Sequence, residues 1–155
     1  MAAGLEVREG ALDDFKEAFN TAASGVLGNV DLSLTQRVDA VLDEEMPSWH
    51  FYESLLRLRP FGQDNPEPVW AMQGVRLAAS PRVVGQQHLK LSFAAGNQVF
   101  DAIAFNCPMD SLPDGLMDIA FTLKENLWNG RRSLQMQIKD IRPAAPLQRE
   151  ERYAD

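Results

Sequence analysis

Apolar and polar side chains alternate with a period of two through much of the second half of the chain, as they do in half-buried β-strands. Asn129-Gly130 stands between two such stretches. Both residues tolerate a positive φ, so the dipeptide predicts a two-residue type I′ hairpin turn. The predicted strands are 68–78, 88–93, 99–106, 117–124 and 133–141.

The alternation also predicts which side chains face a core. The inward positions of the last two strands are Met117, Ile119, Phe121, Leu123, Leu134, Met136 and Ile138. The outward positions are Asp118, Thr122, Lys124, Ser133, Gln135, Gln137 and Lys139. Five short strands with a break between the third and the fourth are typical of an OB-fold. The break holds Pro108 and Pro113, so at most one helical turn fits there; another small barrel or a half-open sheet is the alternative.

The first part of the chain is predicted to be partly helical. The expected elements are strands at 2–8 and 34–42, a helix at 11–27 with an apolar stripe, and a helix from Pro47 to Leu58. Residues 59–68 hold three prolines and one glycine and form a rigid connector. The predicted fold class is mainly β with two helices (α+β): a five-stranded OB-fold barrel preceded by a strand–helix piece and a connecting helix. A strand and a helix cannot bury the stripe alone, so this piece is expected to dock on the rest of the chain or on another domain.

The charge is unevenly distributed. The chain carries a net charge of −7, but residues 1–56 hold 3 basic and 11 acidic side chains, whereas residues 57–145 hold 10 basic and 8 acidic ones. Since a phosphate backbone responds to local charge, the asymmetry permits nucleic-acid binding by the later part. No apolar run approaches the roughly 20 residues that span a bilayer, and the N-terminus does not read as a signal peptide. With a single cysteine, Cys107, the expected location is the cytoplasm, with no membrane partner.

The sequence contains no recognisable catalytic or metal-binding pattern. His50 and His88 are isolated in the sequence, and no Asp/His run supplies a divalent-metal site. Cys107 lacks a surrounding motif, and a structural role is the simpler interpretation. The prediction is therefore that this chain contributes no catalytic residue and no metal ligand.

The features that predict binding lie on the last hairpin and on two strands. Trp128, Arg131 and Arg132 place an indole and two guanidiniums around one turn, a combination suited to base stacking and phosphate pairing. The alternative is that Trp128 folds back on its hairpin and the arginines are merely solvated. The further candidates are Lys90, His88 and Lys139 on outward strand positions and Arg82 in the loop before the second strand.

Several motifs together resemble a known family. They are Arg59-Pro-Phe-Gly-Gln-Asp-Asn-Pro-Glu-Pro68, His88-Leu-Lys-Leu91, Phe100-Asp-Ala-Ile-Ala-Phe-Asn106 and Leu134-Gln-Met-Gln-Ile-Lys-Asp-Ile-Arg-Pro143. They look like the C-terminal part of bacterial RecJ, the single-stranded-DNA-specific exonuclease, and residues 1–7 resemble the end of its DHH-associated domain. Asp64 departs from the glycine that is usual in the family.

The resemblance implies that the chain is a fragment. It implies that residues 1–30 are the end of the DHH-associated domain and that residues 31–66 are a connecting strand and helix with a proline-rich linker. Residues 67–143 would then be the OB-fold and residues 144–155 a disordered tail. Divalent Mg or Mn is expected only in a catalytic domain outside this chain, which is predicted to be inactive alone and to need no cofactor. The implied function is single-stranded-DNA binding for a 5′–3′ exonuclease of DNA repair and recombination. The implied partners are single-stranded DNA, the catalytic domain and a single-stranded-DNA-binding protein; the alternative is a scaffold barrel that braces the catalytic domain.

Overall fold

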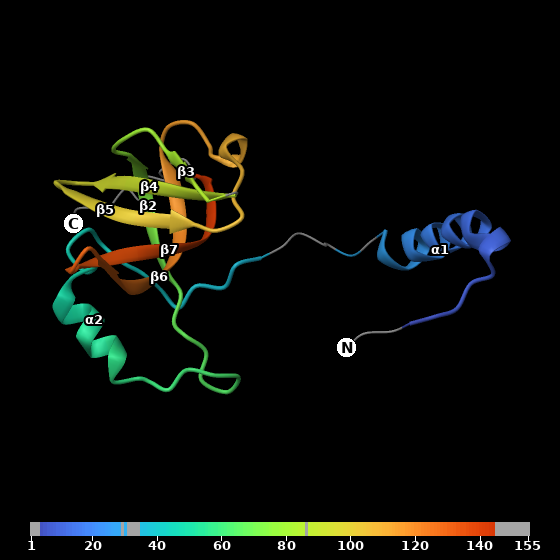
Figure 1. Ribbon diagram of the computed structural model, residues 1–155, viewed down its shortest axis with the longest axis horizontal. Coiled ribbons are helices and arrows are strands. Elements are labelled where there is room, and N and C mark those ends of the chain that lie inside the picture. Colours follow the sequence, from blue (N-terminus) through green and yellow to red (C-terminus); the bar gives the residue numbers. More distant parts are fainter. Residues whose placement is uncertain (1–3, 29, 31–34, 86, 145–155) are drawn as a thin grey trace, which may run out of the picture. The chain divides into compact units, whose positions relative to one another are not determined.

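A computed structural model describes residues 4–28, 30, 35–85 and 87–144 and divides the chain into two compact units (Figure 1). The first unit is Met1–Thr35 and the second is Gln36–Asp155. The segment that was expected to be a disordered tail lies, apart from Ala144, outside the described residues. The backbone N–H of Ala144 donates to the carbonyl of Leu116 at 2.9 Å.

The first unit contains a single turn of 3₁₀ helix, η1 (Glu9–Ala11), and the α-helix α1 (Leu12–Leu27), as the apolar stripe predicted. Asp13 and Asp14 lie in the first turn, where carboxylates interact favourably with the helix dipole. The predicted strand at 2–8 is wrong for residues 4–8, which are irregular. A strand needs a neighbour for its backbone hydrogen bonds, and the described part of this unit offers none.

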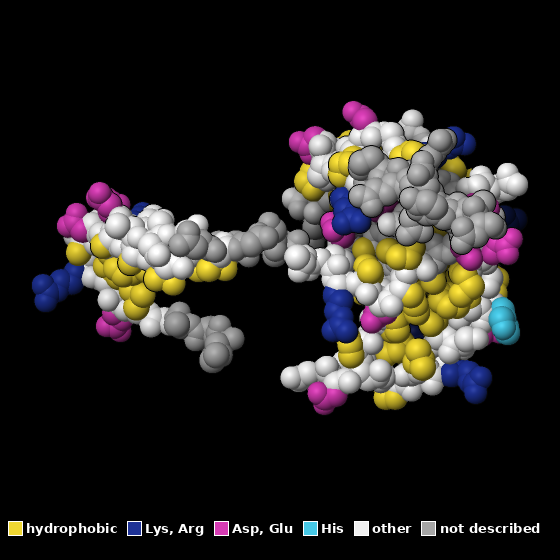
Figure 2. All heavy atoms as spheres, turned by 180° about the vertical axis from the view of Figure 1, so that it is seen from behind, with side chains coloured by type: hydrophobic (Ala, Val, Ile, Leu, Met, Phe, Trp, Pro, Cys, Tyr) yellow, Lys and Arg dark blue, Asp and Glu magenta, His cyan; other side chains and the backbone are white. Residues whose placement is uncertain are grey.

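The apolar stripe of α1 is open to solvent within its own unit. None of the helix's residues is buried, and Phe19 and Val26 are 57% and 76% exposed. Figure 2 shows apolar side chains along one side of this unit. The expectation that the helix does not bury its own stripe is therefore confirmed within the unit.

Five strands of the second unit form a closed barrel. They are β2 (Trp70–Leu77), β4 (His88–Ala95), β5 (Gln98–Ala104), β6 (Met117–Trp128) and β7 (Arg131–Pro143). The ring runs β2–β6–β7–β5–β4 and closes on β2; all pairs are antiparallel except β5–β7. This is the topology of an OB-fold, so the predicted fold class is confirmed. The break between β5 and β6 holds one 3₁₀ turn, η2 (Met109–Ser111), as its prolines predicted.

Two short strands add to the barrel. β1 (Ala40–Val41) pairs parallel with β2, and β3 (Arg82–Val84) pairs antiparallel with β4. Of the described part of the predicted strand at 34–42, only Ala40–Val41 is a strand. Just before it, Asp39 is bonded to Val69 through both its backbone and its side chain. Its N–H donates to the carbonyl of Val69 at 2.8 Å and its carboxylate accepts the N–H of Val69 at 2.8 Å. β3 was not predicted, since three residues are too few to show an alternation.

The helix α2 (Trp49–Leu56) packs against one end of the barrel core (Figure 1). It begins after Pro47 because Ser48 is its N-cap, with the hydroxyl accepting the N–H of Phe51 at 3.2 Å. Tyr52 is buried in the core. In the connector that follows, the amide of Asn65 donates to the carbonyls of Leu58 and Pro60, which holds the chain in a compact turn.

The core is made by the inward positions of the barrel strands. Phe93, Phe121 and Val75 are completely buried, and the inward positions predicted for β6 are all buried. Asp118 and Thr122, which were predicted at outward positions, are nevertheless buried. Gln36, Val38 and Val41 line a hollow together with Asp118 and other residues of β2, β6 and β7. Asp118 is stabilised there by the N–H of Gly74 at 3.2 Å and by Arg142 at 3.1 Å.

Candidate nucleic-acid interface

The β6–β7 hairpin presents an open indole beside an open guanidinium. Asn129 and Gly130 have φ values of 48° and 75°, as a type I′ turn requires. Trp128 and Arg131 lie directly opposite each other on either side of this turn. Trp128 is 72% exposed, so its ring is not folded against the hairpin. We call these two residues the hairpin tip.

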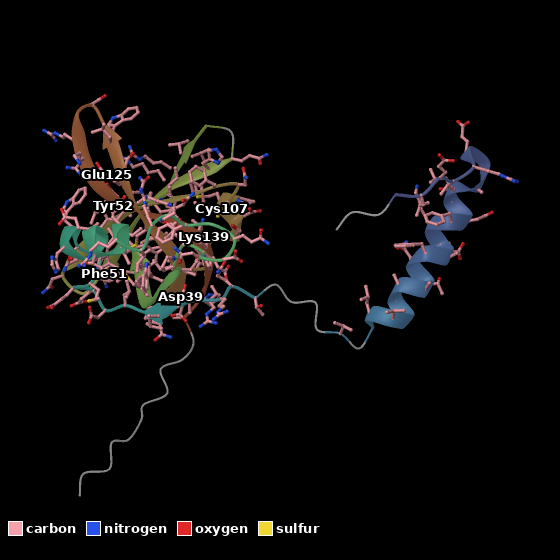
Figure 3. The ribbon with its side chains drawn as sticks, turned by 90° about the horizontal axis from the view of Figure 1, so that it is seen from below. Asp39, Phe51, Tyr52, Cys107, Glu125 and Lys139 are labelled. Carbon is pink, nitrogen blue, oxygen red and sulfur yellow. The ribbon has the colours of Figure 1, made fainter. Side chains whose placement is uncertain are left out.

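Arg132, the next residue, is engaged within the protein. Its Nε and Nη2 donate to the two carboxylate oxygens of Glu125 at 2.5 and 3.1 Å. Its guanidinium lies over the ring of Trp49, 5.2 Å from the ring centroid, which links the hairpin to the first residue of α2. The hydrogen bonds from Arg132 lower the pKa of Glu125, and Glu125 raises the pKa of Arg132. Figure 3 accordingly shows Glu125 and Tyr52, from β6 and α2, on the same side of the molecule.

A second group of the predicted residues lies on the outer face of the sheet. Arg82 stands opposite Lys90, and Lys90 stands opposite Ile103, so the row continues from β3 through β4 to β5. Gln137 of β7 completes it opposite Ile103. The prediction that Arg82 lies in a loop is wrong: it begins β3 and is held in register with Lys90.

His88 and Lys139 lie at one end of this face. The Nδ1 atom of His88 accepts the backbone N–H of Asn106 at 3.2 Å, and its ring packs edge-on against Phe105 with centroids 5.0 Å apart. Lys139 forms a β-bulge in β7. Ile138 pairs with Phe121 and Asp140 pairs with Ala120, which leaves Lys139 without a partner on β6. Ile138 is paired with Ala104 at the end of β5. In Figure 3, Lys139 and Cys107 lie on the side away from Glu125. We call Arg82, His88, Lys90 and Lys139 the strand face.

Ion pairing separates the basic residues of the barrel into two classes. Lys124 is paired with Glu67 at 2.6 Å, Arg142 with Asp118 and Arg132 with Glu125. Within the described ranges, no ion pair involves Arg131 or the three basic residues of the strand face: Arg82, Lys90 and Lys139. The structure thus brings the predicted residues together in two groups and distinguishes free cations from Arg132.

Sequence reasoning missed three side chains that shape these groups. Glu125 and Trp49 determine where Arg132 points, and Phe105 is 46% exposed beside His88. Phe105 follows the inward Ala104, so the alternation of β5 could have placed it on the outer face. Glu125 lies two residues from Leu127, the direct partner of Arg132, so the predicted hairpin could have placed it on the same side. Trp49 had no such signal, since it belongs to a distant helix.

The described residues do not fit a metal centre. Across them, no group of three or more His, Cys, Asp or Glu side chains is placed to hold a metal ion. Cys107 is half-buried, with its Sγ 3.3 Å from the hydroxyl of Ser111. Of the helices that the structure describes, none is long and apolar enough to cross a membrane.

Comparison with known proteins identifies the family of the barrel. A family model described as the RecJ OB domain matches residues 38–140. The chain belongs to the RecJ OB domain family. The match begins just before β1 and ends within β7, so it includes all of β1 to β6 and most of β7 of the RecJ OB barrel.

Curated relatives of this RecJ OB chain carry the name single-stranded-DNA-specific exonuclease RecJ. The proteins of Salmonella typhimurium and Escherichia coli are each 32% identical to it, over 148 and 151 residues. The Bacillus subtilis protein is 26% identical over 144 residues. The alignments cover 92%, 92% and 90% of this chain but 25%, 25% and 18% of those proteins. The chain spans about a quarter of the length of the first two relatives.

A solved structure shares the fold. The crystal structure of RecJ in complex with Mg²⁺ from Thermus thermophilus matches with a TM-score of 0.65 and 23% identity. The match covers 90% of this chain and 21% of that one. At this identity the likeness supports the fold of the RecJ OB chain and nothing finer.

Proposed function

We propose that this chain is the single-stranded-DNA-binding OB portion of a RecJ-type 5′–3′ exonuclease that acts in DNA repair and recombination in the cytoplasm. The observation that carries the proposal is the hairpin tip, where an indole that is 72% exposed lies opposite a guanidinium with no ion pair among the described residues. The family and the names of its relatives support the same interpretation.

The two side chains of the hairpin tip suit the two parts of a nucleotide. An exposed indole offers a flat surface on which a base stacks without sequence preference, at about 1–3 kcal/mol per base. A guanidinium pairs with phosphate oxygens in a planar, two-pronged geometry. The tip therefore provides both contacts within one turn of backbone.

The position of these groups in the barrel also supports the proposal. OB-folds bind oligonucleotides on their second and third strands and on the loops that join strands one to two and four to five. Those parts are here β4, β5, the segment that contains β3, and the β6–β7 hairpin. The hairpin tip and, apart from Lys139 of β7, the strand face occupy these parts, and neither Arg82 nor Lys90 is neutralised by a described carboxylate.

The test is a titration of a fluorescently labelled oligothymidylate with the full chain at about 50 mM salt. We expect binding, and we expect Trp128→Ala to weaken it by about 30-fold, the middle of the range for one lost stacking contact. Leu127→Ala is the matched control, since Leu127 is the neighbouring residue and is 65% exposed. Circular dichroism checks that both variants are folded. Absence of binding by the unaltered chain, or unchanged affinity of folded Trp128→Ala, would refute the proposal.

A scaffold role is the second candidate, favoured by α1. Its apolar stripe has no buried residue within its unit, so it suits a contact with the catalytic domain or with a single-stranded-DNA-binding protein. In this case the barrel would touch DNA little, and the same titration would show no binding. A salt-dependent affinity for oligothymidylate would favour the first function, because phosphate contacts release counterions.

We propose that hydrolysis depends on a catalytic domain outside this chain, where divalent Mg or Mn would bind. The described residues supply no metal cluster of their own. We expect the purified chain to leave a 5′-labelled single strand intact in the presence of either ion. Gel electrophoresis of the reaction checks this, and metal-dependent shortening by a sample free of other nucleases would contradict it.

A further inference from the structure

We propose that Phe105 is a second base-stacking position for single-stranded DNA, separate from the hairpin tip, with the cations of the strand face as its phosphate partners. The inference rests on the proposed function, since it assumes that the barrel binds a single strand. It adds a residue that the family match and the sequence motifs do not assign to binding.

The first observation is that the ring of Phe105 is both open and held. Its side chain is 46% exposed although it directly follows the buried Ala104. The ring of His88 packs against it at 5.0 Å between centroids and 76° between planes. His88 is itself fixed, because its Nδ1 accepts the N–H of Asn106 at 3.2 Å. A ring fixed in this way loses little conformational freedom when a base stacks on it.

The second observation is the charge around the ring. Lys90 is two residues from His88 on the same face of β4, with Arg82 opposite it on β3. Lys139 lies on β7 one residue beyond the partner of Ala104, at the same end of β5 as Phe105. Among the described residues, no ion pair neutralises these three cations. An aromatic ring among free cations is the combination that single-strand binding uses.

Another exposed phenylalanine shows why this setting matters. Phe19 is more exposed than Phe105, at 57%, but it lies on α1, whose first turn carries Asp13 and Asp14. The part of the chain that includes it holds 3 basic and 11 acidic side chains in residues 1–56. Both rings are exposed, but the strands beside Phe105 carry Lys90 and Lys139, which have no ion pair among the described residues. Phe19 therefore serves as the matched control.

The spacing of the two stacking positions predicts the length of DNA that is needed to occupy both. The hairpin tip is at Arg131, and Lys139 is eight residues farther along β7. At about 3.3 Å per residue, this contour is about 26 Å. A very short oligonucleotide would occupy one position, whereas one of about 12 nucleotides, within the site sizes of OB-folds, would reach both.

The experiment combines crosslinking with affinity. An oligothymidylate of about 12 nucleotides that carries 5-iodouracil is bound to the full chain, irradiated and digested, and the crosslinked residues are identified by mass spectrometry. We expect crosslinks at Trp128 and at Phe105. Phe105→Leu keeps an apolar side chain but removes the aromatic face, so we expect it to lose the second crosslink and to weaken binding of the longer oligonucleotide about fivefold. Binding of an oligothymidylate of about 4 nucleotides should change by no more than about twofold.

Two controls separate this inference from the proposed function. Phe105→Tyr retains a ring and should restore the crosslink and the affinity, and Phe19→Leu should leave both unchanged. Suppose that the unaltered chain binds the oligonucleotide and Trp128→Ala weakens this binding, but Phe105→Leu binds as tightly as the unaltered chain and neither protein is crosslinked at position 105. The second stacking position is then refuted, and the proposed function stands. If the unaltered chain binds neither oligonucleotide, both are refuted.

Discussion

Arg131 and Arg132 are neighbours in the chain, yet the structure predicts opposite results for their replacement. Arg131 has no ion pair among the described residues, whereas Arg132 donates two hydrogen bonds to Glu125 and lies over Trp49. A cation that is already paired releases no new counterion from DNA. We therefore expect Arg131→Gln to reduce the salt dependence of binding and Arg132→Gln to leave it unchanged.

The magnitude follows from the number of cations in the hairpin tip and the strand face that have no ion pair among the described residues. Arg131, Arg82, Lys90 and Lys139 make four, and each phosphate neutralised on a single strand contributes about 0.7 to the slope of log K against log salt. Four contacts give a slope of about −2.8, so binding should weaken about 50-fold between 50 and 200 mM salt. With three contacts the slope is about −2.1 and the loss about 18-fold.

The assay is fluorescence anisotropy of a labelled oligothymidylate at four salt concentrations between these limits. Arg8→Gln is the control, because Arg8 is an exposed arginine of the first unit. Thermal unfolding of each variant checks that the barrel is intact. A slope for Arg132→Gln that falls as much as that for Arg131→Gln would refute the division into free and paired cations. An unchanged slope for folded Arg131→Gln would refute the contact itself.

Two further predictions concern stability and pH. Phe93→Ala should lower the free energy of unfolding by about 3–5 kcal/mol, because the ring is completely buried. Val99→Ala, at a residue that is 64% exposed, should change this free energy little, and urea unfolding measures both. In an NMR titration, Glu125 should lose its charge at a lower pH than an ordinary glutamate, because Arg132 lowers its pKa, and Arg132→Gln should move the midpoint upward. The folded state has the lower Glu125 pKa, so the pair stabilises the fold above the unfolded pKa of about 4.3, and this stabilisation is lost as the pH falls through the folded-state pKa. A free energy of unfolding that rises on acidification through this window would contradict the pairing.

The barrel could be predicted because its signals are local. Alternation with a period of two identifies β4, β6 and β7, and Asn129-Gly130 identifies the turn between the last two. β3 was missed because three residues are too short for any period. Residues 4–8 alternate correctly but form no strand, since alternation says nothing about whether a neighbouring strand exists.

The state of the cations could not be predicted in full, because several of them contact partners from distant parts of the chain. Lys124 pairs with Glu67, which is 57 residues away, and Arg132 packs over Trp49 of α2. The sequence therefore identified Arg131 and Arg132 as equivalent, and the structure distinguishes them. The burial of Asp118 has a similar cause: Arg142 and the N–H of Gly74 satisfy its carboxylate from two other strands.

The order of strands around the barrel has a consequence for synthesis on the ribosome. β7 is made last, yet it lies between β6 and β5 and completes the ring. Until residue 143 has emerged, β5 lacks its parallel neighbour and the core lacks Met136, which is buried in it. Pairings between strands so far apart in sequence form slowly, and unpaired strands invite aggregation. A nascent chain that stalls before β7 should therefore be far more dependent on chaperones than one that stalls just after it.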